Sequence, residues 1–390
     1  MNKEEKLLVS ICQSYLNNEK LIIGADIDTK ELYRIAKNHN LIGICHCVLS
    51  DNSELKIDES TLSHFKDKFF DLVYIYTCQS NTLDEIRECF SKAGIQFIPF
   101  KGSVLREIYP VAESRSMGDI DILIKGCDKK KAKKHLEQAG FRLYASNSNV
   151  DEYLRDNILL EVHTRLTAEF GNDAFSNAFD NASFSGFEGR LYDNYHFAYL
   201  IAHIASHLRY RGAGLGLILD LALMLREKEI DLDTVFDILE GIHLVSFAKV
   251  VLSLCNELFG YGERYIDNTD RLAEYFVENG VFGKMKDDKE TTVSRLMEFG
   301  AFDKESKNSS SFLLKLRLAF PPYSTLRKAP YIKFLNGRPW LLPFAWCYRF
   351  FYNLKHNRNH VKKTIASVND EKTLNLAKEE IKFFEEIGLI

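Results

Sequence analysis

The sequence predicts an α+β protein in which a small mixed β-sheet is embedded in a mostly helical chain. Apolar residues recur at helical spacing up to residue 94, alternate with the two-residue period of strands between about 95 and 166, and return to helical spacing from 193. A chain of 390 residues is long enough for two or three substructures. We therefore expect an N-terminal helical region 1–94, an α/β core 95–192, a helical domain 193–300 and a C-terminal helical extension 301–390.

The N-terminal region is predicted to form a helical hairpin followed by a longer helix. Leu7 and Ile11 belong to one apolar face, and the spacing of apolar residues continues through a helix near 62–93. Gly94 follows that helix, and glycine is the residue that most often ends a helix because it adopts left-handed backbone angles without strain. The first strand is therefore expected directly after Gly94.

Five segments of the core have the composition or the alternation of β-strands. They are residues 95–100, 119–124, 141–145, 152–155 and 158–163. Asp156 and Asn157 separate the last two segments, as in a tight hairpin. A helix with a charged face is expected over 129–139.

Two aspartates on the second of these strands are the strongest chemical signal. Asp119 and Asp121 are two positions apart, so their carboxylates project from the same face of the strand, whereas Ile120 and Ile122 point to the other face. Magnesium prefers oxygen ligands and is commonly held by one or two carboxylates together with substrate phosphates. The pair therefore predicts a site for Mg²⁺, with Mn²⁺ as the alternative ion.

A third acidic ligand is expected from a neighbouring strand, because two-metal sites hold both the attacking and the leaving oxygen of a transferred phosphate. Glu161 fits this role, since it lies on an alternating strand between Leu160 and Val162, which face the other way. Glu152 and Asp151 remain the alternatives for the same role.

A short turn before the aspartates is predicted to meet the phosphates. Gly102 and Ser103 lie between a strand and a helical segment, where a glycine lets the backbone amides approach an anion. Lys101 and Arg115 flank the site and could neutralise the charge of a triphosphate. The alternative for both cations is an ion pair with the aspartates themselves.

The order of these features resembles the nucleotidyltransferase fold of the polymerase-beta superfamily, and more closely the uncharacterised bacterial group called nucleotidyltransferase family 5. The resemblance covers about residues 30–290 and rests on Phe100-Lys101-Gly102, Tyr109-Pro110, Arg115, Gly118-Asp119-Ile120-Asp121 and Leu160-Glu161-Val162-His163. It implies that a nucleoside monophosphate is transferred from a nucleoside triphosphate, with ATP favoured, and that Asp119, Asp121 and Glu161 are the catalytic metal ligands.

Two histidines on a later helix are further candidates. His203 and His207 are four residues apart, and His196 lies one heptad before His203, so all three share a face. This spacing can hold zinc, but no acidic or cysteine third ligand is evident nearby, so a hydrogen-bonded structural pair is favoured over a zinc site. The family resembled also has His203 and His207 in this order, which implies a role for the helix in lining the nucleotide or acceptor pocket.

The acceptor is expected to be a small molecule with a hydroxyl group. The formal net charge of −4 gives no general attraction to a polyanion, and only residues 125–134 form a local basic run that would favour RNA. Two alternatives remain open: transfer to a protein or tRNA, as by a toxin-like modifying enzyme, and a non-catalytic regulatory protein that binds nucleotide.

A cytoplasmic location is expected, because the charged N-terminus does not suit a secretory signal and no stretch approaches the ~20 apolar residues of a membrane span. The most apolar segment, 339–352, contains two prolines and an arginine and precedes a basic run, 355–363. We expect it to form a helix on the protein's own core. A helix at a membrane interface is the alternative.

Overall fold

The computed structural model describes residues 1–21, 27–50, 58–166, 174–210, 213–267, 269–279, 319–327, 329, 331–358, 362, 366 and 370–390. The chain divides into two compact units, residues 1–284 and residues 285–390. The expected boundary between 300 and 301 lies outside the described residues.

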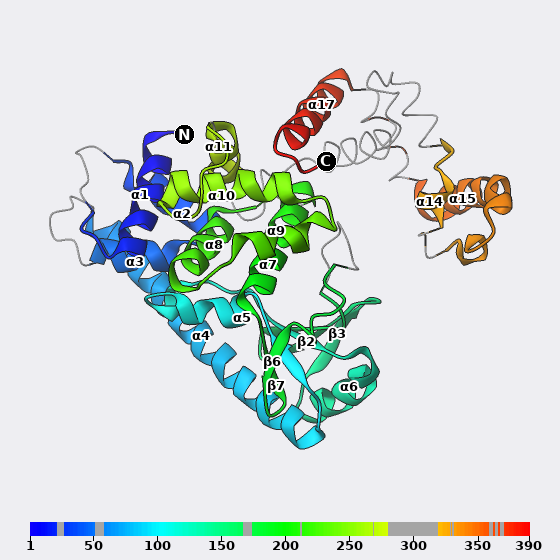
Figure 1. The fold of residues 1–390 in the computed structure, drawn as a ribbon, viewed down its shortest axis with the longest axis horizontal. Coiled ribbons are helices and arrows are strands. Elements are labelled where there is room, and N and C mark those ends of the chain that lie inside the picture. The colour runs from blue at the N-terminus through cyan, green and yellow to red at the C-terminus, as the bar shows by residue number, and fades with distance from the viewer. Residues whose placement is uncertain are drawn as a thin grey trace. The chain divides into compact units, whose positions relative to one another are not determined.

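The part of the chain before the sheet is helical, as the sequence predicts, and its described helices are α1 (Lys3–Asn17), α2 (Thr29–Asn38), α3 (Ile42–Ser50) and the long α4 (Glu59–Ala93) (Figure 1). The Asp58 carboxylate accepts a hydrogen bond from the backbone N–H of Thr61 and so caps the first turn of α4. Gly94 ends α4 with φ 62°, which confirms the predicted stop.

A seven-stranded mixed sheet follows, in the order β3-β4-β5-β2-β1-β7-β6. Its strands are β1 (Phe97–Pro99), β2 (Asp119–Ile124), β3 (Arg142–Ser146), β4 (Val150–Arg155), β5 (Ile158–His163), β6 (Ala182–Ser185) and β7 (Glu188–Leu191). The five predicted strands are confirmed, but the sequence did not predict the hairpin β6–β7. Both of its strands have only four residues, and most of their positions are partly exposed, so their apolar alternation is weak.

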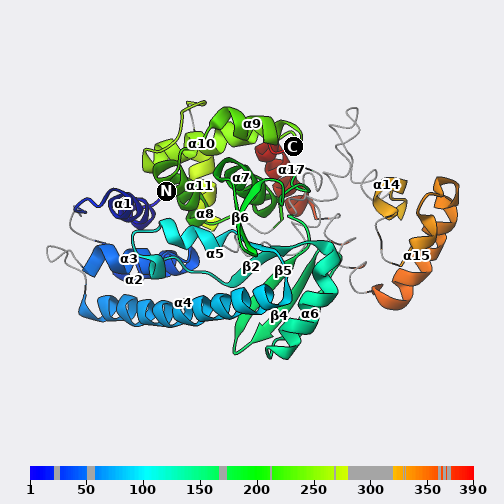
Figure 2. The same cartoon turned by 60° about the horizontal axis from the view of Figure 1, so that its bottom comes forward.

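One face of the sheet is closed by two helices. Apolar side chains of β2 and β5, such as Ile122 and Leu160, share a core with Phe90 of α4 and with Leu136 of α6 (Lys129–Gln138). Figure 2 shows α4 running beneath the neighbouring helices and reaching the sheet beside α6. Because strand side chains alternate, the acidic residues of β2 and β5 lie on the opposite face.

That opposite face meets a short helical segment and the first of the helices that follow the sheet. The segment between β1 and β2 contains α5 (Gly102–Leu105), η1 (Arg106–Ile108) and η2 (Ala112–Ser114), and η3 (Gly126–Asp128) follows β2. The later helices are α7 (Asp193–Tyr210), α8 (Leu215–Glu227), α9 (Leu232–Glu240), α10 (Val245–Phe259) and α11 (Asp270–Asn279). The ring of Tyr199 on α7 packs 5.7 Å from the ring of Phe100, which follows β1. Helix α7 is thereby anchored beside the acidic face.

In the described part of the second unit, α14 (Tyr323–Leu326), η4 (Lys333–Leu335), η5 (Pro339–Leu341) and α15 (Leu342–His356) surround a small core. The last described helix of the unit is α17 (Glu371–Glu386). The apolar segment 339–352 packs one side on this core through Ala345, as predicted. No helix in the described part of the chain combines the length and the hydropathy needed to cross a membrane.

Candidate active site

The predicted acidic residues meet on adjacent strands. Strands β2 and β5 are parallel, and their register places Asp121 beside Glu161 and Asp119 beside Leu159. Asp119 and Asp121 therefore project from the same face as Glu161. Asp121 is only 3% exposed, whereas Glu161 and Asp119 are half-buried.

A histidine that was not predicted as a site residue completes the cluster. His163 Nε2 lies 2.9 Å from Asp121 Oδ1 and 3.1 Å from Glu161 Oε2. The donor atoms of Asp121, Glu161 and His163 lie within 4.8 Å of one another, close enough to bind one metal ion. The sequence contained a signal for this histidine, since it lies two residues after Glu161 on an alternating strand.

The charges of the cluster are strongly coupled. Burial, together with the charges of Asp121 and Glu161, raises the pKa of Asp119 to about 7. Burial opposes ionisation of Asp121, but Lys101 and His163 outweigh it and lower the pKa of Asp121 below its ordinary value. The hydrogen bonds from His163 to the two carboxylates likewise overcome its burial and raise the pKa of His163. The cluster therefore places the acidic side chains in contact with two basic groups, Lys101 and His163.

The two alternative acidic ligands lie in different surroundings. Asp151 faces away from the cluster, and its carboxylate is 2.9 Å from the ammonium of Lys129. Glu152 is directly opposite Glu161 in the antiparallel register of β4 and β5, so it shares the acidic face. Among these three residues, Glu161 is the one whose carboxylate meets Asp121 and His163.

The start of α5 and Lys101 just before it are fixed to the acidic strand and to α7. The backbone N–H of Asp121 donates to Ser103 Oγ at 3.2 Å, and the backbone N–H of Lys101 donates to His196 Nε2 at 3.2 Å. The ammonium of Lys101 lies 2.9 Å from Asp121 Oδ1. The structure therefore contains one of the two interactions predicted for Lys101, an ion pair with an aspartate of the site.

Arg115 lies beside the same turn, but its carboxylate partner comes from α8. Its Nε and Nη2 donate to the two carboxylate oxygens of Asp220, both at 2.8 Å, and Tyr109 Oη donates to the same carboxylate at 2.7 Å. A Cβ added at Gly102 would lie 2.7 Å from Arg115 Nη1. The guanidinium therefore rests against the glycine of the turn while Asp220 fixes its orientation.

His203 and His207 continue a line of rings that starts at the site. The Tyr199 ring stacks on His203 at 6.0 Å, and the His203 ring meets His207 at 4.3 Å. Burial raises the pKa of Tyr199 to about 12, and the charges of Lys101 and Asp121 also act on it. Tyr199 thus contacts both Phe100 and His203 in this line of rings. No third metal ligand joins the histidine pair among the described residues.

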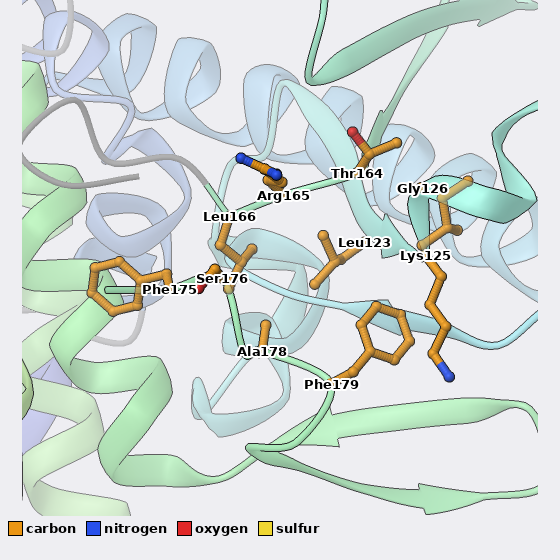
Figure 3. Close-up of a pocket in the computed structure, with 11 residues that line it drawn as sticks. Leu123, Lys125, Gly126, Thr164, Arg165, Leu166, Phe175, Ser176, Ala178 and Phe179 are labelled. Atoms are coloured by element: carbon orange, nitrogen blue, oxygen red, sulfur yellow. The ribbon is translucent and has the colours of Figure 1, made fainter. Parts of the chain in front are cut away.

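A hollow of about 260 Å³ opens at the ends of β2 and β5 (Figure 3). Leu123 lies on its floor, two residues after Asp121 on the same face of β2 and opposite His163 in the register. Phe179 closes one side, and the exposed cations Lys125 and Arg165 lie on its rim. None of the cluster residues lines the hollow, but Leu123 belongs to the same face of β2 as Asp121.

The comparisons with known proteins agree with this geometry. A family model described as an uncharacterised nucleotidyltransferase matches residues 25–260, which include the acidic cluster, the turn and α7. No curated protein and no solved structure matches the chain. The match covers more than half of the 390 residues. The chain belongs to the uncharacterised nucleotidyltransferase family.

Proposed function

We propose that the protein transfers a nucleoside monophosphate from a nucleoside triphosphate, with ATP as the favoured donor, to a hydroxyl group of a small acceptor, releasing pyrophosphate. The observation that carries this proposal is the meeting of Asp119, Asp121 and Glu161 on one face of the sheet, next to the turn at Gly102. In a chain of this family, that arrangement suits a metal–triphosphate complex.

The donor set fits a divalent cation. Asp119, Asp121 and Glu161 share one face, and burial, followed by the charges of Asp121 and Glu161, raises the pKa of Asp119. Asp121, Glu161 and His163 would hold the ion, with Asp119 beside them. When bound, Mg²⁺ or Mn²⁺ would neutralise phosphate charge and favour ionisation of the attacking hydroxyl. Mg²⁺ prefers oxygen ligands, whereas Mn²⁺ accepts an imidazole nitrogen more readily, so the presence of His163 favours Mn²⁺ over Mg²⁺.

The chain's own cations would orient the triphosphate. Lys101 is a buried ammonium beside Asp121, and the guanidinium of Arg115 lies against Gly102 with its orientation fixed by Asp220. Both can contact phosphate oxygens from the side of the turn. The Ser103 hydroxyl ties this turn to β2, so the phosphate-binding and metal-binding parts would move as one body.

The transfer itself needs a group that takes up the hydroxyl proton and a place where the small acceptor molecule binds. The hydroxyl oxygen attacks the α-phosphorus, the bond to the bridging oxygen of pyrophosphate breaks, and the hydroxyl proton passes to Glu161. The hollow at the ends of β2 and β5 offers an apolar floor at Leu123 and cations at Lys125 and Arg165. It suits a small acceptor with an apolar body and an anionic or polar group.

Calorimetric titration with non-hydrolysable ATP, GTP, CTP and UTP analogues, with and without Mg²⁺ or Mn²⁺, tests the donor site. We expect metal-dependent binding that is lost in the Asp119→Ala/Asp121→Ala variant. The matched control is Asp156→Asn, which alters an exposed carboxylate in the turn between β4 and β5. Equal binding by wild type and the double variant would contradict the proposed site.

Turnover distinguishes the alternatives. Cell extract is incubated with the protein and α-labelled triphosphate, then separated into small molecules, protein and RNA. Label in the small-molecule fraction that depends on Asp121 supports the proposal. Label in protein or tRNA would favour the modifying-enzyme alternative, and binding without any transfer would favour a nucleotide-binding regulator.

A further inference from the structure

The second unit contains a long stretch without acidic residues. Residues 306–369 include 12 Lys and Arg and no Asp or Glu, although the whole chain has 51 basic and 55 acidic residues. The stretch also holds both tryptophans of the protein, Trp340 and Trp346. A cationic, aromatic segment in an otherwise acidic chain indicates an anionic partner.

Helix α15, within this stretch, is apolar on two opposite sides. Its inner side contains Ala345, which is buried in the core of the unit, and Trp346, whose Nε1 donates to the carbonyl of Pro321 at 2.8 Å. Its outer side contains Phe344, Tyr348, Phe351 and Leu354, all exposed and spaced by three or four residues. A helix that packs on a single neighbour usually has polar residues on the side that faces the solvent.

The exposure of the outer side is large. Phe344 is 70% exposed and Phe351 is 68% exposed, and Trp340, one helical turn before Phe344, is 69% exposed. We call these residues, together with Tyr348 and Leu354, the aromatic face. Large exposed apolar side chains gathered on one side of a helix indicate a binding surface rather than the singly scattered apolar residues of an ordinary exterior.

Cations flank the aromatic face without interrupting it. Arg338 lies just before Trp340, and Lys355 and Arg358 follow Leu354; all three are exposed. This arrangement, with apolar rings in the middle and cations at both ends, suits contact with an anionic membrane surface, where rings enter the headgroup region and cations meet lipid phosphates.

We propose that the aromatic face binds the surface of an anionic lipid bilayer, with the rings inserted among the headgroups and the flanking cations on lipid phosphates. A nucleic-acid site would instead interleave cations with the rings along a groove. A second copy of the same face is disfavoured, because pairing would bring the two sets of cations together. The inference is independent of the transferase chemistry.

Intrinsic fluorescence gives a direct test, because both tryptophans lie in this unit. In Trp346→Phe protein, Trp340 is the only tryptophan and reports on the aromatic face. Full-length protein is titrated with phosphatidylcholine vesicles that contain or lack phosphatidylglycerol, and binding is also measured by co-sedimentation. We expect a blue shift of Trp340 and co-sedimentation with the anionic vesicles only, weakened by high salt.

Two pairs of variants locate the surface. Phe344→Ser/Phe351→Ser removes two rings, with Phe70→Ser, another exposed phenylalanine, as its control. Lys355→Glu/Arg358→Glu reverses two charges, with Lys130→Glu/Lys134→Glu on α6 as its control. Each test variant should bind anionic vesicles at least tenfold more weakly than its control, with unchanged circular dichroism.

Several results would overturn the proposal. Failure to bind vesicles of either composition would overturn it, and so would equal binding to neutral and anionic vesicles. Binding of single-stranded RNA through the same residues, in protein that ignores vesicles, would assign the face to nucleic acid. Conversion of a dimer to a monomer by Phe344→Ser/Phe351→Ser, again without vesicle binding, would assign it to a second copy.

Discussion

The buried charged residues around the acidic face are each stabilised by a specific partner of opposite charge. Lys101 lies against Asp121 and Arg115 against Asp220, and all four side chains are largely removed from water. A buried ion whose partner is removed becomes costly, because nothing then compensates its lost hydration. Single substitutions at this site should therefore affect stability and ligand binding together, and matched double substitutions can separate the two effects.

We predict that Asp220→Asn destabilises the protein by about 3–5 kcal/mol, because it leaves the Arg115 guanidinium buried without its carboxylate. Urea unfolding followed by circular dichroism measures this change. The double variant Arg115→Met/Asp220→Leu should lose less stability than the sum of the two single changes. It should still bind triphosphate more weakly than wild type, and normal affinity would argue against a phosphate contact by Arg115.

His163 should affect the choice of metal ion more than the binding of nucleotide. Its imidazole nitrogen suits Mn²⁺ better than Mg²⁺, which prefers oxygen. We predict that His163→Asn lowers Mn²⁺ affinity by on the order of tenfold and Mg²⁺ affinity by less. Competition between the two ions, followed by Mn²⁺ electron paramagnetic resonance, gives both values. A proportional loss of both ions would mean that His163 acts only through its hydrogen bonds to Asp121 and Glu161.

At the scale of elements, two helices bring distant parts of the chain to the site. Helix α4 supplies core residues to the sheet, and its end at Gly94 directs the chain into β1. Helix α7 crosses the acidic face, where His196 accepts the N–H of Lys101 and Tyr199 packs on Phe100. The ends and positions of these helices therefore determine where the turn at Gly102 lies.

The left-handed backbone at Gly94 predicts a measurable cost for a side chain there. With φ 62° and no neighbouring atom closer than 3.8 Å to an added Cβ, Gly94→Ala should cost about 1 kcal/mol through backbone strain alone. Gly241, which ends α9 with φ −59°, is the matched control. Gly241→Ala should leave the unfolding midpoint unchanged or slightly raised, and equal losses for both variants would contradict the explanation.

For the whole molecule, buried histidines make the fold sensitive to acid. His39 joins three helical parts, since its Nε2 lies 2.7 Å from the carbonyl of Val277 and the N–H of Leu215 donates to its Nδ1 at 3.2 Å. Burial lowers the pKa of His39 and lowers the pKa of His196 to about 4. Both side chains are therefore held neutral in contacts that a second proton would disrupt.

The depressed pKa of His196 predicts a loss of stability between pH 6.5 and about 4. In that window the unfolded chain binds a proton at His196 and the folded chain does not, so the free energy of unfolding falls as pH falls. The contribution of neutral His196 to the free energy of unfolding is fully present above pH 6.5, and about 3 kcal/mol of it is lost by pH 4. Urea unfolding at several pH values should show a shallower pH dependence in His196→Gln, and an unchanged slope would exclude this residue as a cause.

Local patterns were sufficient for much of the fold and for part of the site. Two-residue alternation located β2 and β5 and placed Asp119, Asp121 and Glu161 on their strands, because side-chain direction in a strand depends only on position. Gly94 was recognisable as a helix end for an equally local reason. The hairpin β6–β7 escaped this reasoning because its short strands form only by pairing with each other and with β1.

The sequence by itself determined the α+β class, the family resemblance and the acidic strand residues of this protein. Only the tertiary structure decided that Arg115 pairs with Asp220, 105 positions away, and that His163 bridges two carboxylates. It also decided that one side of α15 packs on a core while the aromatic face stays exposed. Periodicity specifies which way a side chain points, but its partner depends on which elements pack together, and that is a property of the whole chain.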